Sequence, residues 1–279
     1  MTEVLRYAAF TTTPEGGNPA GVVLDADGLT DLAMQAIAAD VGYSETAFVR
    51  RGAMPRRRPM RYFSPLAEVP FCGHATIAAS VALGEREGVG LWVFETPVGE
   101  IAVETSADEI GVVARMRSVA TSSAPASGTD LDLALAALRW PASDLADLPV
   151  HVAFGGNHHL VVPAGSRERL ADLDYDFEAL KSLMTDRRWT TIQLVHIENE
   201  TLIHARNPFP VGGIVEDPAT GAAAAALGGY LRALKKIERS MSITIRQGED
   251  MGRPSEILLE VEPDDPQVTI SGRAVPMGI

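Results

Sequence analysis

The chain has 279 residues, of which 46% are hydrophobic and 22% are charged. This composition indicates one large or two medium folded domains and excludes a wholly disordered or fibrous protein. The 24 Lys and Arg residues face 37 Asp and Glu residues, which gives a formal charge of −13. Because binding to phosphates needs surplus cations, we expect neither nucleic acid nor an anionic membrane as the main partner.

A metal site or a membrane location is not expected from the residues present. The single cysteine, Cys72, excludes an intrachain disulfide and a zinc site built from cysteines. His158 and His159 are adjacent on a predicted strand and therefore face opposite sides, so we assign no metal. The sequence shows no signal-peptide pattern and no apolar run near the ~20 residues of a membrane span, so we expect a cytoplasmic location.

The predicted elements comprise more strands than helices. An apolar stripe behind Thr30 predicts one surface helix, formed by Leu29, Ala33, Ala36 and Ile37. A second stripe behind Asp176 predicts another helix, and a third helix is expected over Leu131–Arg139, before Pro141. Runs rich in β-branched residues predict strands at Ala20–Leu24, Thr46–Val49, Leu91–Glu95, Gly111–Met116, Thr191–Ile197, Ile243–Arg246 and Glu256–Val261.

Two segments are predicted to form buried helices. Small residues surround nearly the whole helix in His74–Leu83 and Ala222–Leu234, and small side chains allow a sheet to approach closely. We therefore expect one central helix inside a curved sheet in each of two domains. The composition of Thr121–Thr129 predicts a linker, and six arginines predict a solvated hairpin loop or a patch for an acidic protomer, namely Arg50, Arg51, Arg56, Arg57, Arg58 and Arg61.

An internal repeat supports two similar domains. At a constant offset of 148, the residues Glu68, Pro70, Gly73, Ala75, Ala78 and Leu83 fall on Glu216, Pro218, Gly221, Ala223, Ala226 and Leu231. A second match, at an offset of 139, relates Gly17-Asn18 to Gly156-Asn157. The repeat makes each predicted central helix begin at a glycine, Gly73 or Gly221. The unpaired N–H groups there suit a carboxylate or an enolate-like intermediate, although close packing would also explain the glycines.

Three ionisable residues lie near these helix starts in the sequence or by the repeat. Glu45 precedes a strand, a position more typical of a solvated turn residue. His74 lies in the first turn of a buried helix, where the helix dipole disfavours a charged imidazole; a hydrogen-bonded core histidine is the alternative. Asp217 lies just ahead of the second helix, where simple capping is the alternative to a catalytic role.

The motifs, taken together, resemble the phenazine-biosynthesis PhzF-like family. They are Phe10-Thr11, Gly17 to Val22, Gly42 to Phe48, Phe71 to Thr76, Glu216 to Gly221 and Gln247 to Ser255, and they span nearly the whole chain. The resemblance implies an α+β protein with a diaminopimelate epimerase-like fold. Such a fold has two similar domains, each a curved, mostly antiparallel, barrel-like sheet around a central helix. We expect the first domain over 1–118 with a C-terminal strand at 266–279, and the second over 119–265, in a homodimer.

The resemblance also implies an isomerase that moves a proton between carbons of a small carboxylic acid, in a cleft between the domains, without a metal or organic cofactor. Glu45 would be the general acid/base, and His74 and Asp217 would assist proton transfer and hold the substrate. Residues implied in substrate binding are Asn18, Cys72, Gly73, Thr220, Gly221 and Ala222.

Two departures from the family leave alternatives open. Ala222 stands where the phenazine enzyme has a serine, so activity on the phenazine precursor is in question and a non-catalytic carboxylate-binding or sensing protein is an alternative. The epimerase relatives use a thiol at each helix start, whereas this chain has Cys72 and Thr220. Two-thiol epimerisation is therefore not expected, and a non-thiol racemase or epimerase is the third possibility.

Overall fold

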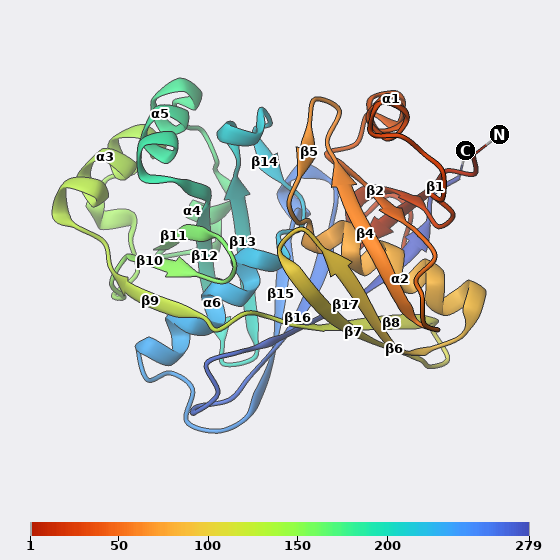
Figure 1. Cartoon of the computed structure of the whole chain (residues 1–279). Coiled ribbons are helices and arrows are strands. Elements are labelled where there is room, and N and C mark those ends of the chain that lie inside the picture. The colour runs from red at the N-terminus through yellow and green to blue at the C-terminus, as the bar shows by residue number, and fades with distance from the viewer. Residues whose placement is uncertain (1, 279) are drawn as a thin grey trace. The chain divides into compact units, whose positions relative to one another are not determined.

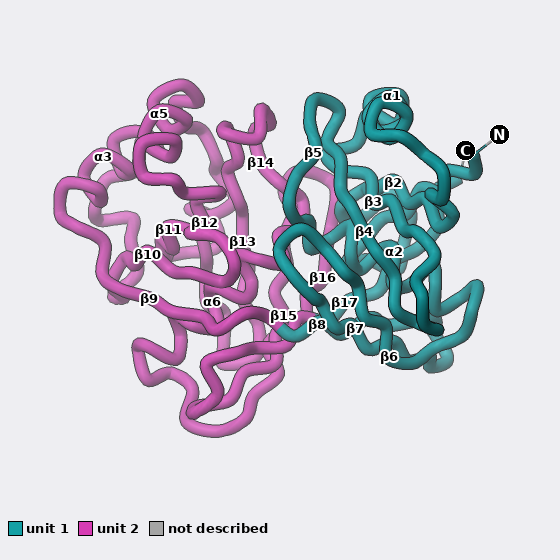
Figure 2. Tube along the Cα trace, in the orientation of Figure 1, with its two compact units in different colours: residues 1–117, 271–279 teal, residues 118–270 magenta. Residues whose placement is uncertain are grey.

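The structure is a computed structural model that describes residues 2–278 (Figure 1). The chain divides into two compact units (Figure 2). Unit 1 comprises Met1–Arg117 and Ser271–Ile279, and unit 2 comprises Ser118–Ile270. Within the described residues, no helix is long and apolar enough to cross a membrane.

Eight strands of unit 1 form a closed sheet among the described residues. They are β1 (Leu5–Ala9), β2 (Asn18–Val23), β3 (Glu45–Val49), β4 (Arg57–Phe63), β6 (Gly90–Thr96), β7 (Gly99–Ala107), β8 (Val112–Arg117) and β17 (Thr269–Pro276). Each strand pairs with the next in this order, and β17 also pairs with β1, which closes the sheet. Only β2–β3 and β4–β6 are parallel in the registers described. A short strand, β5 (Glu68–Val69), pairs with β4.

The first predicted central helix is α2 (Gly73–Glu87). It contacts β1, β2, β3, β7 and β8, and its residues from His74 to Gly84 are all buried. Small residues allow this burial on every side: a Cβ added at Gly84 would lie only 3.0 Å from a methyl carbon of Val112. The helix therefore fills the inside of the closed sheet, as the small-residue pattern predicted.

Unit 2 repeats the same strand order. Its main strands are β9 (Ser122–Pro125), β10 (His151–Phe154), β11 (His158–Pro163), β12 (Trp189–Asn199), β13 (Leu202–Pro208), β15 (Met241–Gln247) and β16 (Ser255–Val261). The parallel pairs, β11–β12 and β13–β15, occupy the places of β2–β3 and β4–β6. The short strand β14 (Glu216–Asp217) pairs with β13, as β5 does with β4. The second central helix, α6 (Gly221–Ala233), contacts β9, β10, β11 and β16.

The repeat predicted from the sequence is therefore a repeat of structure. Gly17 and Gly156 precede β2 and β11 by one and two residues, and both have positive φ, 66° and 105°. Glycine adopts this left-handed region without steric cost, which allows the tight turn before each parallel strand. Every predicted strand overlaps a strand of the structure; the sequence patterns missed several others, including β4, β7 and β13.

The outer helices begin at residues that cap them. Helices α1 (Asp31–Val41), α3 (Gly128–Leu138), α4 (Arg167–Ala171) and α5 (Phe177–Arg187) each have an N-cap side chain that accepts a backbone N–H bond. The caps are Thr30, Ser127, Ser166 and Asp176 in that order. The predicted stripe of α1 was partly wrong, because Met34 and Ala38 form its buried face and Ala36 is exposed.

The predicted linker at Thr121–Thr129 is wrong. Ser122–Pro125 forms β9 against β10, and Gly128 begins α3. The small residues serve close packing instead of flexibility: a Cβ added at Gly229 of α6 would lie 2.9 Å from Cβ of Thr121. Three single turns complete the described elements, η1 (Ala142–Asp144), η2 (Pro210–Gly212) and η3 (Glu249–Met251).

The prediction of a solvated basic hairpin loop is right only in part: residues 50–56 connect the antiparallel strands β3 and β4, and the Arg51 side chain there is 76% exposed. Arg57, Arg58 and Arg61 belong to strand β4, and each forms an ion pair with a glutamate of unit 1. Arg56 lies over the ring of Trp92, 5.1 Å from its centroid. Charges that look clustered in the sequence are thus neutralised within their own unit.

Candidate active site

The starts of α2 and α6 differ from those of the outer helices. Cys72 and Thr220 are the N-cap residues, and neither side chain caps the helix behind it. The first N–H groups of an α-helix have no partner within the helix and carry the positive end of its dipole. Both starts therefore keep the character of an anion-binding site.

Close packing does not explain the glycine at the start of α2. A Cβ added at Gly73 would meet its nearest atom, the Met116 methyl carbon, at 3.9 Å, which is an ordinary contact. The space beside Gly73 is therefore open. This observation favours the interpretation that a ligand approaches the backbone at Gly73.

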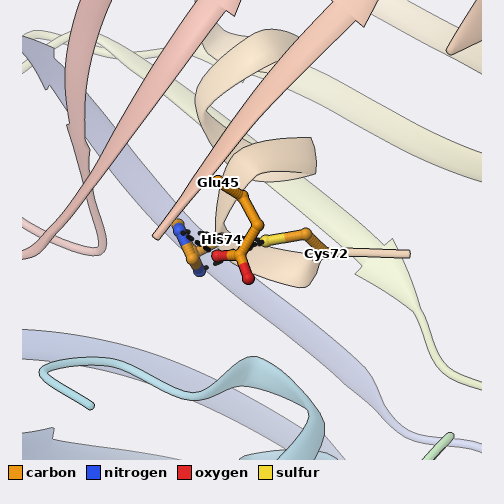
Figure 3. A group of neighbouring side chains, drawn as sticks. All are labelled: Glu45, Cys72 and His74. Atoms are coloured by element: carbon orange, nitrogen blue, oxygen red, sulfur yellow. Dashed lines mark hydrogen bonds and ion pairs between the residues drawn. The ribbon is translucent and has the colours of Figure 1, made fainter. Parts of the chain in front are cut away.

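Glu45, Cys72 and His74 lie together at the start of α2 (Figure 3). Oε2 of Glu45 lies 3.5 Å from Nε2 of His74 and 3.5 Å from Sγ of Cys72. Sγ of Cys72 lies 3.4 Å from Nδ1 and 3.8 Å from Nε2 of His74. The His74 side chain is 7% exposed and that of Glu45 is 19% exposed. The trio thus combines a carboxylate, a thiol and an imidazole with limited access to solvent.

Asn18 and Ser44 hold the imidazole of His74. Nδ2 of Asn18 lies 3.3 Å from Nδ1 of His74, and Oγ of Ser44 lies 3.4 Å from Nε2. When the Asn18 amide donates to Nδ1, the neutral ring carries its proton on Nε2, which faces Glu45. The ring can then donate a hydrogen bond to the carboxylate without being charged.

Tyr62 stabilises the first turn of α2 through a hydrogen bond to Thr76. Thr76 Oγ1 donates to the carbonyl oxygen of Cys72 at 2.7 Å, and Tyr62 Oη lies 2.7 Å from Thr76 Oγ1. Because the threonine proton is used, the Tyr62 hydroxyl is the donor. Burial raises the pKa of Tyr62, which keeps that hydroxyl protonated.

In unit 2, Asp217 and Thr220 form a turn that Gln247 holds. Thr220 Oγ1 donates to Oδ2 of Asp217 at 2.5 Å. Gln247 Nε2 donates to the carbonyl oxygen of Asp217 at 2.6 Å, and Gln247 Oε1 accepts the Thr220 N–H at 3.2 Å. Gln247 is 1% exposed, so these bonds are shielded from water. The turn presents the Asp217 carboxylate just ahead of α6.

The segment that follows Gln247 supports the same turn. Ser255 Oγ donates to the carbonyl oxygen of Pro218 at 2.9 Å. Gly248 has φ of 76°, and a Cβ there would lie 2.8 Å from that same oxygen, so only glycine fits. The motif from Gln247 to Ser255 therefore has a structural function, which is to position residues 217–220.

The predicted site residues gather in two groups. Asn18, Cys72, Gly73, His74 and Glu45 lie together in unit 1. Asp217, Thr220, Gly221 and Ala222 lie around the start of α6 in unit 2. The roles assigned to these residues stay predictions.

Sequence reasoning missed three residues that hold these groups. Ser44, Tyr62 and Gln247 were given no role. The presence of Ser44 and Gln247 inside the quoted motifs was a signal, whereas Tyr62 had none.

The comparisons with known proteins identify the family. The family described as "Phenazine biosynthesis-like protein" matches residues 7–278, and the chain belongs to it. The chain is 33% identical to a trans-2,3-dihydro-3-hydroxyanthranilate isomerase of Pseudomonas chlororaphis, over 97% of this chain and 95% of that protein.

Solved structures share the fold. A phenazine biosynthesis protein of the PhzF family from Bacillus anthracis has a TM-score of 0.89 and 30% identity, over 99% of this chain and 97% of that one. A probable proline racemase from Agrobacterium radiobacter has a TM-score of 0.71 at 14% identity, over 100% of this chain and 92% of that one, and is similar in fold alone. The predicted α+β, diaminopimelate epimerase-like fold is confirmed, and the relatives support an isomerase role.

Proposed function

We propose that this protein is a cofactor-independent isomerase that moves a proton between carbons of a small carboxylic acid. The observation that carries the proposal is the place of Glu45. Its carboxylate lies 3.5 Å from His74 Nε2, beside the uncapped start of a buried helix. A partly buried carboxylate next to a hydrogen-bond donor and an anion-binding backbone suits proton abstraction next to a carboxylate.

The proposed reaction uses Glu45 as both base and acid. The Glu45 carboxylate removes a proton from a carbon of the substrate, and the electron pair left behind delocalises as in an enolate. The protonated Glu45 then returns the proton to a different carbon, so that no net proton is gained or lost. His74 donates from Nε2 to the Glu45 carboxylate and keeps it oriented.

The remaining proposed residues hold the substrate. Backbone N–H groups at Gly73 and Gly221 bind its carboxylate or the delocalised charge, for which the positive helix ends are suited. Asp217 assists proton transfer and holds a polar group of the substrate. The hydrogen bonds from Thr220 and Gln247 support this by fixing the turn that carries Asp217.

The experiment that tests the proposal is proton NMR in heavy water with a panel of small carboxylates. The panel includes trans-2,3-dihydro-3-hydroxyanthranilate, because a relative is named as its isomerase. We expect isomerisation of at least one acid, with deuterium entering the product carbon. Glu45→Gln is expected to lower the rate by about 10²–10⁴-fold, which is the usual contribution of a general acid/base.

The matched control is Glu262→Gln, which removes an exposed glutamate just beyond β16 and is expected to leave the rate unchanged. If Glu45→Gln kept the full rate while remaining folded, the assignment of the base would be wrong. Binding without isomerisation or exchange across the panel would favour the alternative of a non-catalytic binding protein. Ala222, which lacks the family's hydroxyl, is the observation that keeps this alternative open. Deuterium returning to the original carbon with inversion would instead indicate an epimerase that works without thiols.

A further inference from the structure

The thiol of Cys72 has no part in the proton transfer proposed above, yet it lies among the groups that perform it. Cys72 is the only cysteine of the chain and is 7% exposed. One donor atom from each of Glu45, Cys72 and His74 can be chosen so that all lie within 4.8 Å of one another. A thiol, an imidazole and a carboxylate form the kind of mixed donor set that Zn²⁺ prefers and that Mg²⁺ and Ca²⁺ do not.

The distances between the donors match a tetrahedral zinc site. Zinc–donor distances of about 2.3 Å for sulfur and about 2.0–2.2 Å for nitrogen and oxygen place neighbouring donors about 3.3–3.6 Å apart in a tetrahedron. The observed distances are 3.5 Å from Glu45 Oε2 to His74 Nε2 and 3.5 Å from Glu45 Oε2 to Cys72 Sγ. The third distance, from Cys72 Sγ to His74 Nε2, is 3.8 Å. Shifts of a few tenths of an ångström would complete the geometry.

We propose that Glu45, Cys72 and His74 bind one Zn²⁺ ion, and that the bound ion inhibits proton transfer. On binding, the Cys72 thiol loses its proton to solvent and the thiolate, the imidazole and the carboxylate each supply one electron pair. A water molecule takes the fourth position, as in other sites with three protein ligands. This proposal departs from the sequence-based expectation of no metal, which considered only cysteine pairs and the two adjacent histidines.

The surroundings of His74 suit a metal ligand. Coordination through Nε2 moves the single ring proton to Nδ1, which then needs an acceptor. Asn18 lies 3.3 Å from Nδ1, and rotation of its amide group offers the oxygen instead of the nitrogen. The ligating imidazole would thus keep the outer hydrogen bond that such ligands normally have.

The dipole of helix α2 opposes the binding of a cation at this site. The start of α2 carries the positive end of the helix dipole, which disfavours a nearby positive charge only weakly. Coordination of zinc by three protein ligands that already lie close together is several times stronger than this repulsion. The ligands therefore outweigh the dipole.

Inhibition follows from the identity of the ligands and rests on the proposed function. The Glu45 carboxylate, which is proposed to remove the substrate proton, would be bonded to zinc through Oε2, the oxygen that faces His74. The proton that His74 donates to that oxygen would be absent as well. A bound ion therefore removes both the base and the group that orients it.

The first test measures binding without any substrate. Isothermal titration of the full-length, metal-free protein with ZnCl₂ is expected to show one site with a dissociation constant of about 1 μM or lower. Loss of a residue that only hydrogen-bonds to a zinc ligand typically weakens binding about 10–100-fold. Cys72→Ser removes a ligand itself, so we expect it to weaken zinc binding by more than this. The control His158→Ala, which removes an exposed histidine of β11, is expected to bind as the unchanged protein does. Unchanged zinc affinity in Cys72→Ser would overturn the proposal.

A spectroscopic test covers the case in which Cys72→Ser fails to fold. Co²⁺ bound by a thiolate gives a charge-transfer absorption in the near ultraviolet, and the chain has only one thiol. We expect this absorption in the full-length protein with CoCl₂, and its loss when ZnCl₂ is added in competition. MgCl₂ is expected to give neither heat of binding nor displacement. Binding of Co²⁺ without the thiolate absorption would overturn the proposal.

The second half of the proposal is tested on the reaction. Zinc at saturating concentration is expected to lower the rate of deuterium incorporation at least tenfold, and EDTA is expected to restore it. A rate unchanged or raised by bound zinc would overturn the inhibition. If the protein isomerises no acid of the panel, the titration and the cobalt spectrum still decide whether the metal site exists, so the two proposals can fail separately.

Discussion

The starts of α2 and α6 occupy equivalent positions and carry different chemistry. At the repeat offset of 148, Cys72, Gly73 and His74 fall on Thr220, Gly221 and Ala222, and Val69 falls on Asp217. Unit 1 surrounds its helix start with a carboxylate, a thiol and an imidazole. Unit 2 has one carboxylate, which accepts a hydrogen bond from a threonine in a turn held by a glutamine.

The difference shows what the repeated scaffold supplies and what it leaves open. Both units give a buried helix of small residues whose N-cap side chain, Cys72 or Thr220, makes no capping hydrogen bond. An anion-binding backbone is therefore common to both. Of the two helix starts, that of unit 1 has more groups able to exchange protons, namely those of Glu45, Cys72 and His74.

The largest expected contrast concerns an arginine–glutamate pair that both units contain. Arg61 of β4 pairs with Glu68 of β5, and Arg206 of β13 pairs with Glu216 of β14. The Arg206 and Glu216 side chains are 10% and 5% exposed, whereas those of Arg61 and Glu68 are 27% and 37% exposed. Burial makes the same pair far more costly to break.

We predict that Arg206→Met lowers the free energy of unfolding by about 3–5 kcal/mol, because it leaves the Glu216 carboxylate buried without its partner. Arg61→Met is expected to cost about 1 kcal/mol or less, since water can solvate Glu68. Urea unfolding followed by circular dichroism measures both. Equal losses in the two variants would show that the burial difference does not set the energies.

The supports of the two helix starts give a smaller contrast. We predict that Gln247→Leu lowers the free energy of unfolding by roughly 2–3 kcal/mol, because it removes the side-chain donor to the Asp217 carbonyl and the acceptor of the Thr220 N–H. It is also expected to lower kcat, since the turn that presents Asp217 loses its position. Tyr62→Phe, which removes a support of the helix start in unit 1, loses one hydrogen bond to Thr76 and should cost only about 0.5–1.5 kcal/mol.

Urea unfolding and steady-state kinetics test this pair of variants. If Gln247→Leu lowered stability but left kcat and KM unchanged, the turn would be structural only. If the two variants were equally stable, the bonds of Gln247 to Asp217 and Thr220 would contribute no more than the single bond of Tyr62.

Local pattern was enough to predict the two central helices, and the repeat was enough to predict two similar domains. Small residues on all sides of a helix indicate that the helix is buried, and the glycines before β2 and β11 indicate turns with positive φ. The linker was wrong because Thr121 and Ser122 are small for the sake of packing on Gly229, a partner more than a hundred residues away. Arg57, Arg58 and Arg61 looked solvated because their partners, such as Glu95 for Arg57, come from other elements of unit 1.

The site was predicted only in part for the same reason. Spacing alone favoured a solvated turn for Glu45, and the family resemblance was needed to place it beside His74. Gln247 reaches Asp217 across 30 residues of sequence, a contact that follows from strand pairing and not from local pattern. The residues at the two helix starts, such as His74 and Asp217, were predictable from the sequence. The residues on neighbouring strands that hold them, such as Tyr62 and Gln247, were not.

A third contrast is a histidine in the sheet of unit 2 where unit 1 has alanine. At the offset of 139, His159 falls on Ala20, and both are fully buried. Burial, with a smaller effect of His158, lowers the pKa of His159 to about 3. The unfolded chain, with a histidine pKa of about 6.5, therefore binds the proton first as the pH falls. Stability present above about pH 6.5 is lost progressively toward pH 3, by about 2 kcal/mol at pH 5.

We predict that His159→Gln removes this part of the acid sensitivity. Urea unfolding at pH 7.5 and pH 5 measures the difference in each variant. His158→Gln, which changes the exposed neighbour on the same strand, is the control and should keep the acid sensitivity of the unchanged protein. An undiminished loss at pH 5 in His159→Gln would mean that other groups cause the acid sensitivity.

The smallest expected effect concerns Ala222, which occupies the position in the repeat that is equivalent to His74. Ala222→Ser gives the start of α6 a hydroxyl, which the phenazine-biosynthesis relatives are expected to have at this position. One added hydrogen bond to the substrate, worth about 0.5–1.5 kcal/mol, would raise kcat/KM for trans-2,3-dihydro-3-hydroxyanthranilate by about two- to tenfold. Ala36→Ser, on the exposed face of α1, is the control for the substitution itself and should leave the kinetics unchanged. A higher kcat/KM in Ala222→Ser with unchanged stability would show that a side chain at this position can contact the substrate. An unchanged kcat/KM would mean that unit 2 contributes through its backbone and Asp217 alone.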